Sequence, residues 1–151
     1  MSTISRHVIR SGDAEIVYRL MGEGPPIILL HPFPANHEFW LPVAEALSSR
    51  YRMVLPDLRG HGDSEAGEGD ATIQKHAEDI SRVMDHAAIG RAPMCGVSIG
   101  GYVLFEFWRR NRGRVARLGL INTKAAADSM EGRAARIQTA NDVLERGTEA
   151  F

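Results

Sequence analysis

The sequence predicts an α/β protein: a mostly parallel sheet of about six strands, with an antiparallel hairpin at its N-terminal end and helices on both faces. Three observations lead to this fold class. Short apolar runs alternate along the chain with segments of helical periodicity, which is typical of βαβ units. Several of these runs lack polar alternation, as expected for strands that helices cover on both sides. Residues 4–20 instead show two segments joined by a turn, which predicts the hairpin.

Six strands are expected, two in the hairpin and four in the rest of the sheet. They cover residues 4–10, 15–20, 26–30, 52–55, 93–97 and 115–121. In the second of them, Ile16 and Tyr18 alternate with polar neighbours, which is typical of a half-buried strand. The third is apolar throughout and therefore predicts a buried parallel strand.

Four helical segments lie between or after these strands, at residues 40–47, 73–87, 99–110 and 131–146. Pro42 falls in the first turn of the first helix, where proline is tolerated. The second helix has an apolar stripe at helical spacing, formed by Ile73, Ala77, Ile80, Met84 and Ala87. Asp70 is its expected N-terminal cap and Gly90 its expected end. The last segment is rich in alanine and has only a weak apolar stripe.

The composition is that of an ordinary globular protein of one domain, with 151 residues of which 44% are hydrophobic and 25% charged. The net charge of -1 favours neither nucleic acid nor an anionic membrane surface as a partner. No apolar run approaches the roughly 20 residues that span a bilayer, and the first residues lack the apolar stretch of a signal peptide. The single cysteine, Cys95, suits a reducing compartment. We therefore expect a cytoplasmic protein without a membrane or nucleic-acid partner.

The most informative motif is the pentapeptide at residues 96–100, GVSIG, which follows an apolar strand and opens an apolar helix. This context predicts a nucleophile elbow, a sharp strand-to-helix turn that exposes a serine hydroxyl. Ser98 would be strained there, and the small Gly96 and Gly100 leave room for the turn. The start of the helix directs free amides at the reacting centre, so the backbone N–H of Ile99 is a candidate oxyanion donor.

Two further motifs fall at the ends of predicted strands. They are LHPFP at residues 30–34 and DLRGHGDS at residues 57–64. The carboxyl ends of parallel strands meet at one edge of a sheet, where ligands bind in such folds. In this order and spacing, these two motifs and GVSIGG at residues 96–101 resemble those of α/β-hydrolase fold proteins. The chain is similar to the N-terminal part of bacterial 3-oxoadipate enol-lactonases and cofactor-free haloperoxidase-like serine esterases.

This resemblance implies a division of the chain and a set of roles. Residues 1–128 would form the N-terminal part of the hydrolase core, truncated after the sixth strand, and residues 129–151 the start of a lid. Ser98 would be the nucleophile, and the backbone N–H groups of Phe33 and Ile99 would form the oxyanion hole. The family usually has His-Gly where this chain has a histidine followed by a proline, but the expected donor, Phe33, keeps its N–H. No cofactor is implied, and no histidine pair has metal-binding spacing.

The acid and the base of a triad follow the nucleophile on this scaffold, yet no histidine follows Ser98 in the sequence. All six precede it: His7, His31, His37, His61, His76 and His86. Of these, His31 and His61 lie near the expected site, and we expect each to hold a loop by hydrogen bonds. Asp128 is a candidate acid, and the alternative is a solvated residue entering a cap helix. We therefore expect weak or absent activity from this chain alone.

The sequence thus favours a serine hydrolase that cleaves a carboxylic ester or lactone through an acyl-enzyme. Perhydrolysis and C–C bond hydrolysis use the same serine and stay open, whereas the resemblance disfavours epoxide hydrolases and haloalkane dehalogenases, which carry aspartate at the elbow. A catalytically silent binding or assembly module is the alternative from another class. Because the strand at 117–121 would be an exposed edge, we also expect self-association through it.

Overall fold

The computed structural model describes residues 3–147 and contains one six-stranded sheet with the order β1-β2-β4-β3-β5-β6. The strands are β1 (Ile4–Ser11), β2 (Ala14–Met21), β3 (Pro26–Leu30), β4 (Arg52–Pro56), β5 (Ala92–Val97) and β6 (Val115–Ile121). The pairs β1–β2 and β2–β4 are antiparallel, while β3 pairs in parallel with β4 and β5, and β5 in parallel with β6. The predicted hairpin and the mostly parallel sheet behind it are confirmed.

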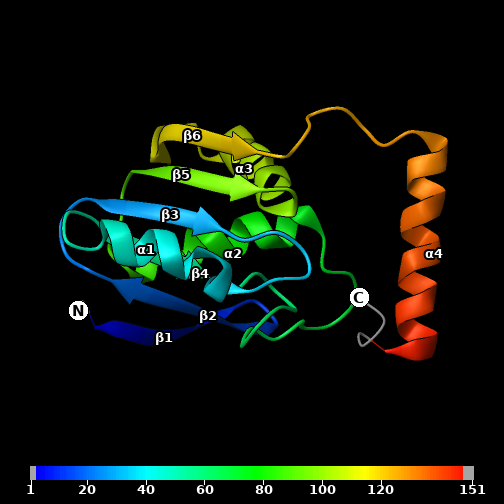
Figure 1. Cartoon of the computed structure of the whole chain (residues 1–151), viewed down its shortest axis with the longest axis horizontal. Helices are drawn as coiled ribbons and strands as arrows, with labels where there is room; N and C mark the ends of the chain where they lie inside the picture. Colours follow the sequence, from blue (N-terminus) through cyan, green and yellow to red (C-terminus); the bar gives the residue numbers. More distant parts are fainter. Residues whose placement is uncertain (1–2, 148–151) are drawn as a thin grey trace.

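Helices lie on both faces of the sheet, as expected (Figure 1). They are α1 (Leu41–Leu47), α2 (Ile73–His86), α3 (Ile99–Arg110) and α4 (Met130–Arg146), with short 3-10 helices η1 (His37–Trp40) and η2 (Arg112–Arg114). Helix α1 covers one face and α2 and α3 cover the other. Pro42 occupies the first turn of α1, where its missing N–H costs nothing.

Helix α2 begins and ends at other residues than the sequence predicts. Thr72 caps its start, because its hydroxyl accepts a hydrogen bond from the Lys75 amide at 3.2 Å. The helix ends before Ala88, which adopts a left-handed conformation with φ of 54°. Hydrogen bonds from Ile89 N to Met84 O and from Ala88 N to the carbonyl of residue 85 complete a Schellman motif. Glycine is favoured at this position, which is why the sequence indicated the nearby Gly90 as the helix end, and that prediction is wrong.

Two apolar clusters lie between the sheet and its helices, one on each face of the sheet. The larger lies under α2 and α3 and includes Ile28, Leu30, Val54, Ile80, Met84, Leu104 and Phe107. The smaller lies under α1 and includes Leu29, Trp40, Ala44, Met53 and Leu55. Neighbouring residues of β3 and β4 alternate between the two clusters, which explains why both strands are apolar throughout.

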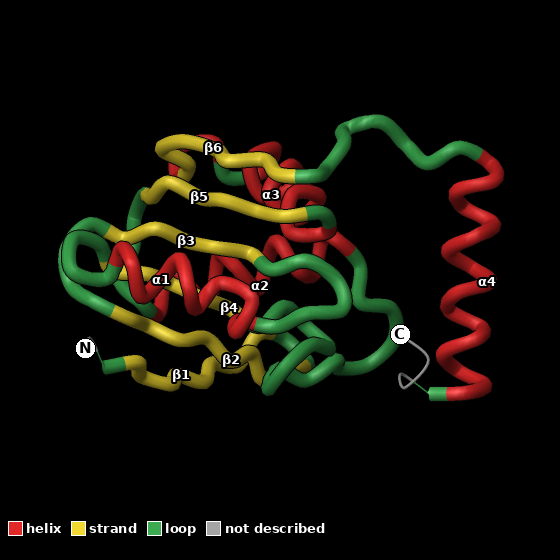
Figure 2. Tube along the Cα trace, viewed as in Figure 1, coloured by secondary structure: helices red, strands yellow, loops and turns green. Residues whose placement is uncertain are grey.

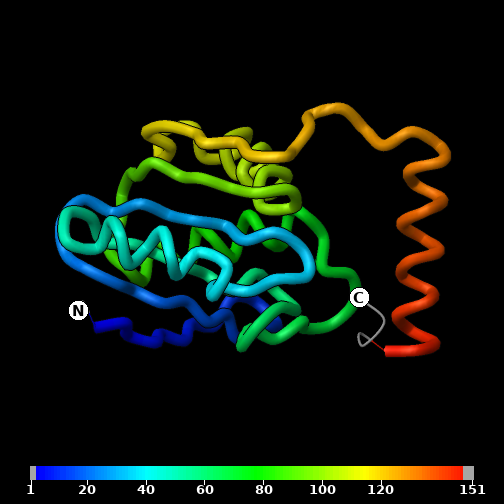
Figure 3. The backbone as a smooth tube through the Cα atoms, viewed as in Figure 1, coloured from blue at the N-terminus to red at the C-terminus, as the bar shows by residue number. Residues whose placement is uncertain are grey.

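Strand β6 forms one edge of the sheet, and helix α4 stands away from it (Figures 1 and 3). Leu120 and Ile121 are 41% and 47% exposed. Within residues 3–147, no residue of α4 is buried. The expected lid segment, 129–151, is described as far as residue 147, and residues 148–151 lie outside the described residues. No described helix is both long and apolar enough to cross a membrane.

Candidate active site

The three sequence motifs lie at the carboxyl ends of neighbouring strands. Strands β3, β4 and β5 run in the same direction, so the connections that follow them start on the same side of the sheet (Figure 2). The pairing of Leu30 with Gly96 places the ends of β3 and β5 next to each other. The loop that carries Phe33 therefore starts beside the turn that carries Ser98, which is the arrangement that the sequence predicts.

Ser98 occupies a strained turn between β5 and α3. Its φ of 52° and ψ of -114° lie outside the regions that residues with a side chain favour. Such strain costs on the order of 1–3 kcal/mol and persists only where the surroundings hold it. Here the Ser98 amide donates to the Ile121 carbonyl at 3.0 Å, and the Thr123 hydroxyl donates to the Ser98 carbonyl at 3.0 Å. The connection after β6 thus secures the turn from the neighbouring strand.

The glycines around Ser98 permit a very close approach of backbone segments. A Cβ on Gly96 would lie 2.5 Å from the carbonyl carbon of Gly100, and a Cβ on Gly100 would lie 2.6 Å from the Leu30 carbonyl oxygen. Both distances are shorter than any real Cβ contact, so a side chain at either position would force the turn open. The start of α3 therefore sits directly against β5 and the end of β3, as an elbow requires.

The two residues whose amides the sequence predicts as oxyanion donors follow strands β3 and β5. Ile99 is the first residue of α3, so its N–H is one of the amides without a partner inside the helix. Phe33 lies in the loop after β3, and 54% of its surface is exposed. Both residues therefore lie at the carboxyl ends of the parallel strands, on the side of the sheet that carries Ser98. Their role as donors to an oxyanion stays a prediction.

His31 is buried beneath this loop and is fully engaged. Its Nε2 accepts a hydrogen bond from the Leu58 amide at 2.9 Å, so its Nδ1 carries the proton and donates to the Pro32 carbonyl at 2.9 Å. Burial lowers the pKa of His31 to about 4, so the ring is neutral at pH 7. With both nitrogens engaged, His31 holds two loops together and has no lone pair left for a catalytic proton.

A second anchor of the same loop was missed by the sequence reasoning. The fully buried carboxylate of Asp57 accepts hydrogen bonds from the backbone amide of His37 at 2.7 Å and from its Nδ1 at 2.9 Å. Its other oxygen accepts from the Asp63 amide at 3.1 Å. The position of an aspartate directly after a buried strand was the available signal. Its partner lies 20 residues away in sequence, so no local pattern identifies it.

Three of the remaining histidines lie in the loop after β4 or on helix α2. The Nδ1 of His61 lies 3.0 Å from the Arg59 carbonyl, as expected for a residue that holds a loop. His76 is buried on α2, where burial lowers its pKa to about 4. His86 lies at the other end of α2, with its Nδ1 2.8 Å from the Tyr18 hydroxyl.

Asp128 lies in the connection between β6 and α4. Its carboxylate forms ion pairs with Lys124 Nζ at 2.7 Å and Arg136 Nε at 2.6 Å, and these contacts lower its pKa below the ordinary value. It lines an open hollow of about 460 Å³ together with Tyr102, which lies one helical turn after Ser98. Both carboxylate oxygens are engaged by cations, and a catalytic role for Asp128 stays a prediction.

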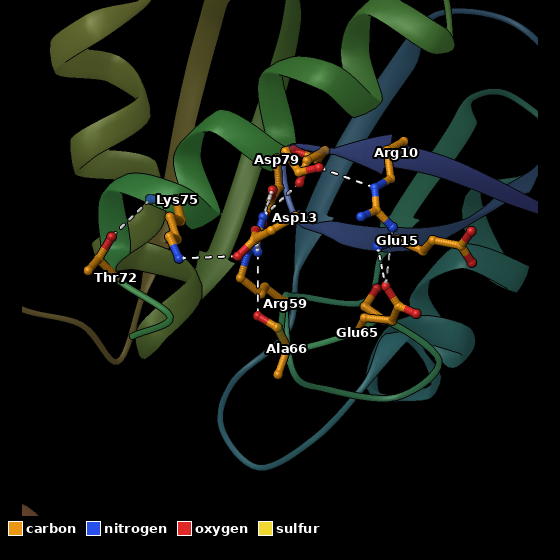
Figure 4. Close-up of polar contacts among 12 residues, drawn as sticks. Arg10, Asp13, Glu15, Arg59, Glu65, Ala66, Thr72, Lys75 and Asp79 are labelled. Carbon is orange, nitrogen blue, oxygen red and sulfur yellow. Dashed lines mark hydrogen bonds and ion pairs between the residues drawn. The ribbon is translucent and has the colours of Figure 1, made fainter. Parts of the chain in front are cut away.

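Arg59 connects the loop after β4 to the hairpin turn and to α2 (Figure 4). Its guanidinium forms a bidentate pair with Asp79 of α2, at 3.0 and 2.8 Å, and also donates to Asp13 at 2.6 Å and to the Ser11 carbonyl at 3.0 Å. Arg59 and Asp79 are both 3% or less exposed. The loop that carries the DLRGHGDS motif is thereby tied to the hairpin turn and to α2. Among residues 3–147, no cluster of three or more acidic, histidine or cysteine side chains is arranged to hold a metal ion.

Comparison with known proteins agrees with this geometry. A family model described as alpha/beta hydrolase fold matches residues 25–150, which is most of the chain. The chain belongs to this family. The fold class and the resemblance predicted from the three motifs are thereby confirmed.

Solved and curated hydrolases are similar to this family member over most of its length. A thermophilic esterase from Thermogutta terrifontis matches with a TM-score of 0.89 and 34% identity, over 96% of this chain and 55% of that one. The enol-lactonase from Burkholderia xenovorans LB400 matches with a TM-score of 0.86 and 33% identity, over 95% and 56%. A soluble epoxide hydrolase from Corynebacterium sp. (strain C12) is 32% identical over 123 residues, 81% of this chain and 43% of that protein. The chain spans about half the length of the curated relatives it matches.

Proposed function

We propose that this chain carries the nucleophile half of a serine hydrolase site that acts on a small carboxylic ester or lactone. The observation that carries the proposal is the strained conformation of Ser98 at the turn from β5 into α3. Strain of this kind needs support from its surroundings and is found mainly at functional sites. The similarity to an esterase and to an enol-lactonase supports the substrate class.

In the proposed reaction, the Ser98 hydroxyl attacks the carbonyl carbon of the substrate. The carbonyl oxygen gains negative charge, and the amides of Phe33 and Ile99 donate hydrogen bonds to it; each such donor typically contributes about 2.7–4 kcal/mol in the transition state. The bond to the alcohol oxygen then breaks, the alcohol leaves with the proton from the Ser98 hydroxyl, and an acyl group remains on Ser98. Water cleaves this acyl-enzyme, releases the acid and returns the proton to the serine. No cofactor takes part.

We expect this turnover to be slow in the chain alone. A serine hydroxyl needs a base to remove its proton, and His31 has both ring nitrogens engaged. An oxyanion hole and substrate binding, without the rest of a triad, still accelerate the reaction about 10³–10⁴-fold over the reaction in water. We propose residues 1–128 as the catalytic core and residues 129–151 as the start of a lid. We also keep the cytoplasm as the proposed compartment.

A fluorophosphonate probe tests the proposal, because it forms a covalent bond with an activated serine. We expect slow labelling of a single residue, identified as Ser98 by peptide mass spectrometry, and faint hydrolysis of p-nitrophenyl esters. Ser98→Ala removes both and keeps the fold, which circular dichroism checks. Labelling that persists in Ser98→Ala would refute the assignment of the nucleophile. Labelling of the parent at the rate of a complete serine esterase would show that a base is present within the chain.

A catalytically silent binding module is the alternative that the engaged state of His31 favours. In that case the region around Ser98 would hold a small ester or its acid without cleaving it. Calorimetric titration with a non-hydrolysable ester analogue separates the two functions when it is combined with the turnover assay. Binding by both the parent and Ser98→Ala, with the same ester hydrolysis rate in both, would support the module. Loss of hydrolysis in Ser98→Ala with binding retained supports the enzyme.

A further inference from the structure

Two loops at the candidate site are joined through histidine side chains. The loop after β3 covers residues 31–36, and the loop after β4 covers residues 57–72, of which residues 57–64 carry the motif. At one end of the first loop, the Nε2 of His31 accepts from the Leu58 amide at 2.9 Å. At the other end, the amide and the ring of the following residue, His37, donate to Asp57. Both ends of the first loop are therefore fixed to the second.

The middle of the first loop has a different kind of support. Phe33 is 54% exposed, and its ring lies edge-to-face on the ring of His61, with 5.7 Å between the ring centroids and an interplanar angle of 88°. The His61 ring in turn lies 5.2 Å from the ring of His31. A series of two ring contacts therefore connects the exposed Phe33 to the buried His31. Edge-to-face contacts at such distances favour a defined arrangement of the two rings.

The surroundings of His61 fix the position of its ring. Its Nδ1 donates to the Arg59 carbonyl at 3.0 Å. Nε2 is buried and has no hydrogen-bond partner among the described residues. The backbone around it is a tight turn, in which the His61 amide donates to the Leu58 carbonyl and the Ser64 amide to the His61 carbonyl, at 2.8 and 2.9 Å. The ring is thus anchored on one side and contacts the Phe33 ring at an interplanar angle of 88°.

We infer that His61 is a positioning residue: its ring sets the place of Phe33 and thereby the direction of the Phe33 amide. This inference rests on the proposed function, in which that amide donates to the oxyanion. A donor acts only when it points at the place where charge develops, so a loop free to move would lose most of its effect. His61 acts through Phe33 and has no contact with the reacting atoms in this role.

The required chemistry of His61 is that of an aromatic ring, which permits a sharp test. His61→Ala removes the ring, whereas His61→Phe keeps it and loses only the hydrogen bond to the Arg59 carbonyl. His7→Ala is the matched control, because His7 also stacks on an aromatic ring, Tyr18, at 5.0 Å, but lies on β1 at the far edge of the sheet. Thermal melting of all variants verifies that they fold.

Two measurements are made on each variant. The first is the exchange rate of the Ala35 amide hydrogen by NMR, because this amide donates to the Pro32 carbonyl at 3.0 Å across the turn that contains Phe33. The second is fluorophosphonate labelling of Ser98, separated into probe affinity and maximal rate. We expect His61→Ala to speed the exchange about tenfold and to lower the maximal labelling rate about tenfold with little change in probe affinity. His61→Phe and His7→Ala should stay within about threefold of the parent.

The outcomes separate this inference from the proposed function. Faster exchange in His61→Ala with rescue by His61→Phe supports the inference. Unchanged exchange in His61→Ala, or equal losses in His61→Ala and His61→Phe, overturns it. If the parent is labelled no faster than Ser98→Ala, the proposed function fails. The exchange rates then decide by themselves whether His61 holds the loop.

Discussion

At the scale of single residues, burial decides which histidines exist as neutral rings. His31 is fully buried and His76 is 2% exposed, and burial is the main reason why the pKa of each falls to about 4. The Asp79 carboxylate raises the pKa of His76 and the Arg59 guanidinium lowers it, but burial has the largest effect. Neutral His31 can accept from the Leu58 amide, whereas a protonated ring could not. The hydrogen bond that joins His31 to the loop after β4 therefore depends on an uncharged His31 ring.

Acid should destabilise the fold through these two residues. A histidine with a pKa of about 4 in the folded chain and about 6.5 in the unfolded chain stabilises the fold fully above pH 6.5. This contribution is lost as the pH falls from 6.5 to 4, because the unfolded chain binds the additional proton. Between pH 7.5 and 4.5, the free energy of unfolding should fall more in the parent than in His76→Phe. We expect the two decreases to differ by about 2–3 kcal/mol. Urea unfolding at both values measures this difference, and parallel pH profiles would contradict it.

At the scale of elements, one buried arginine joins three parts of the chain. Arg59 contacts the hairpin turn through Asp13 and Ser11 and helix α2 through Asp79. The pairing with Asp79 raises the pKa of Arg59 above its ordinary value, and the Arg59 guanidinium lowers that of Asp13. The contacts join segments that are 20 to 48 residues apart in sequence. The loop that carries His61 is therefore held by tertiary contacts on both sides.

Removing this arginine should cost far more than removing an exposed one. Arg59→Met leaves the carboxylate of Asp79 buried without its cation, and such losses are typically about 3–5 kcal/mol. Arg109→Met is the matched control, because Arg109 also pairs with a carboxylate, Glu106, at 2.8 Å but has a side chain that is 63% exposed. Its removal should change the free energy of unfolding much less, because an ion pair in water contributes little. Urea unfolding of both variants checks the difference, and losses of equal size would show that the buried pair has no special role.

At the scale of the whole molecule, one edge of the sheet is open. Strand β6 pairs only with β5 among the described residues, and α4 stands away from the sheet (Figure 1). Leu120 and Ile121 are nearly half exposed at this edge. An exposed edge strand with apolar side chains offers unpaired backbone groups to another chain. Self-association through residues 117–121 therefore stays our expectation for the isolated chain.

A charge on this edge should weaken that association. We expect sedimentation velocity to show the parent forming dimers or larger species as its concentration rises. Leu120→Lys should shift it toward monomer, since lysine on an edge strand discourages pairing. Val43→Lys is the matched control: Val43 is 40% exposed, against 41% for Leu120, but lies on α1. A parent that is monomeric at every concentration, or an equal effect of both substitutions, would exclude an interface at β6.

The fold and the position of the elbow could be predicted from the sequence because both depend on local patterns. Apolar periodicity located all six strands within a residue or two, and the glycines around Ser98 marked the turn that the structure shows. The end of α2 was misplaced for the same reason. A left-handed residue there favours glycine, and only the packed helix shows that Ala88 takes that conformation.

The sequence by itself thus determined the family, the order of strands and helices along the chain, and the serine at the elbow. Only the tertiary structure decided which side chains hold the loops around that serine. The pairing of His37 with Asp57, the contact of His61 with Phe33 and the position of Arg59 all join segments at least 20 residues apart. Periodicity and short motifs report on neighbours along the chain. Burial, tautomers and ring contacts depend on residues that become neighbours only when the sheet and its helices pack.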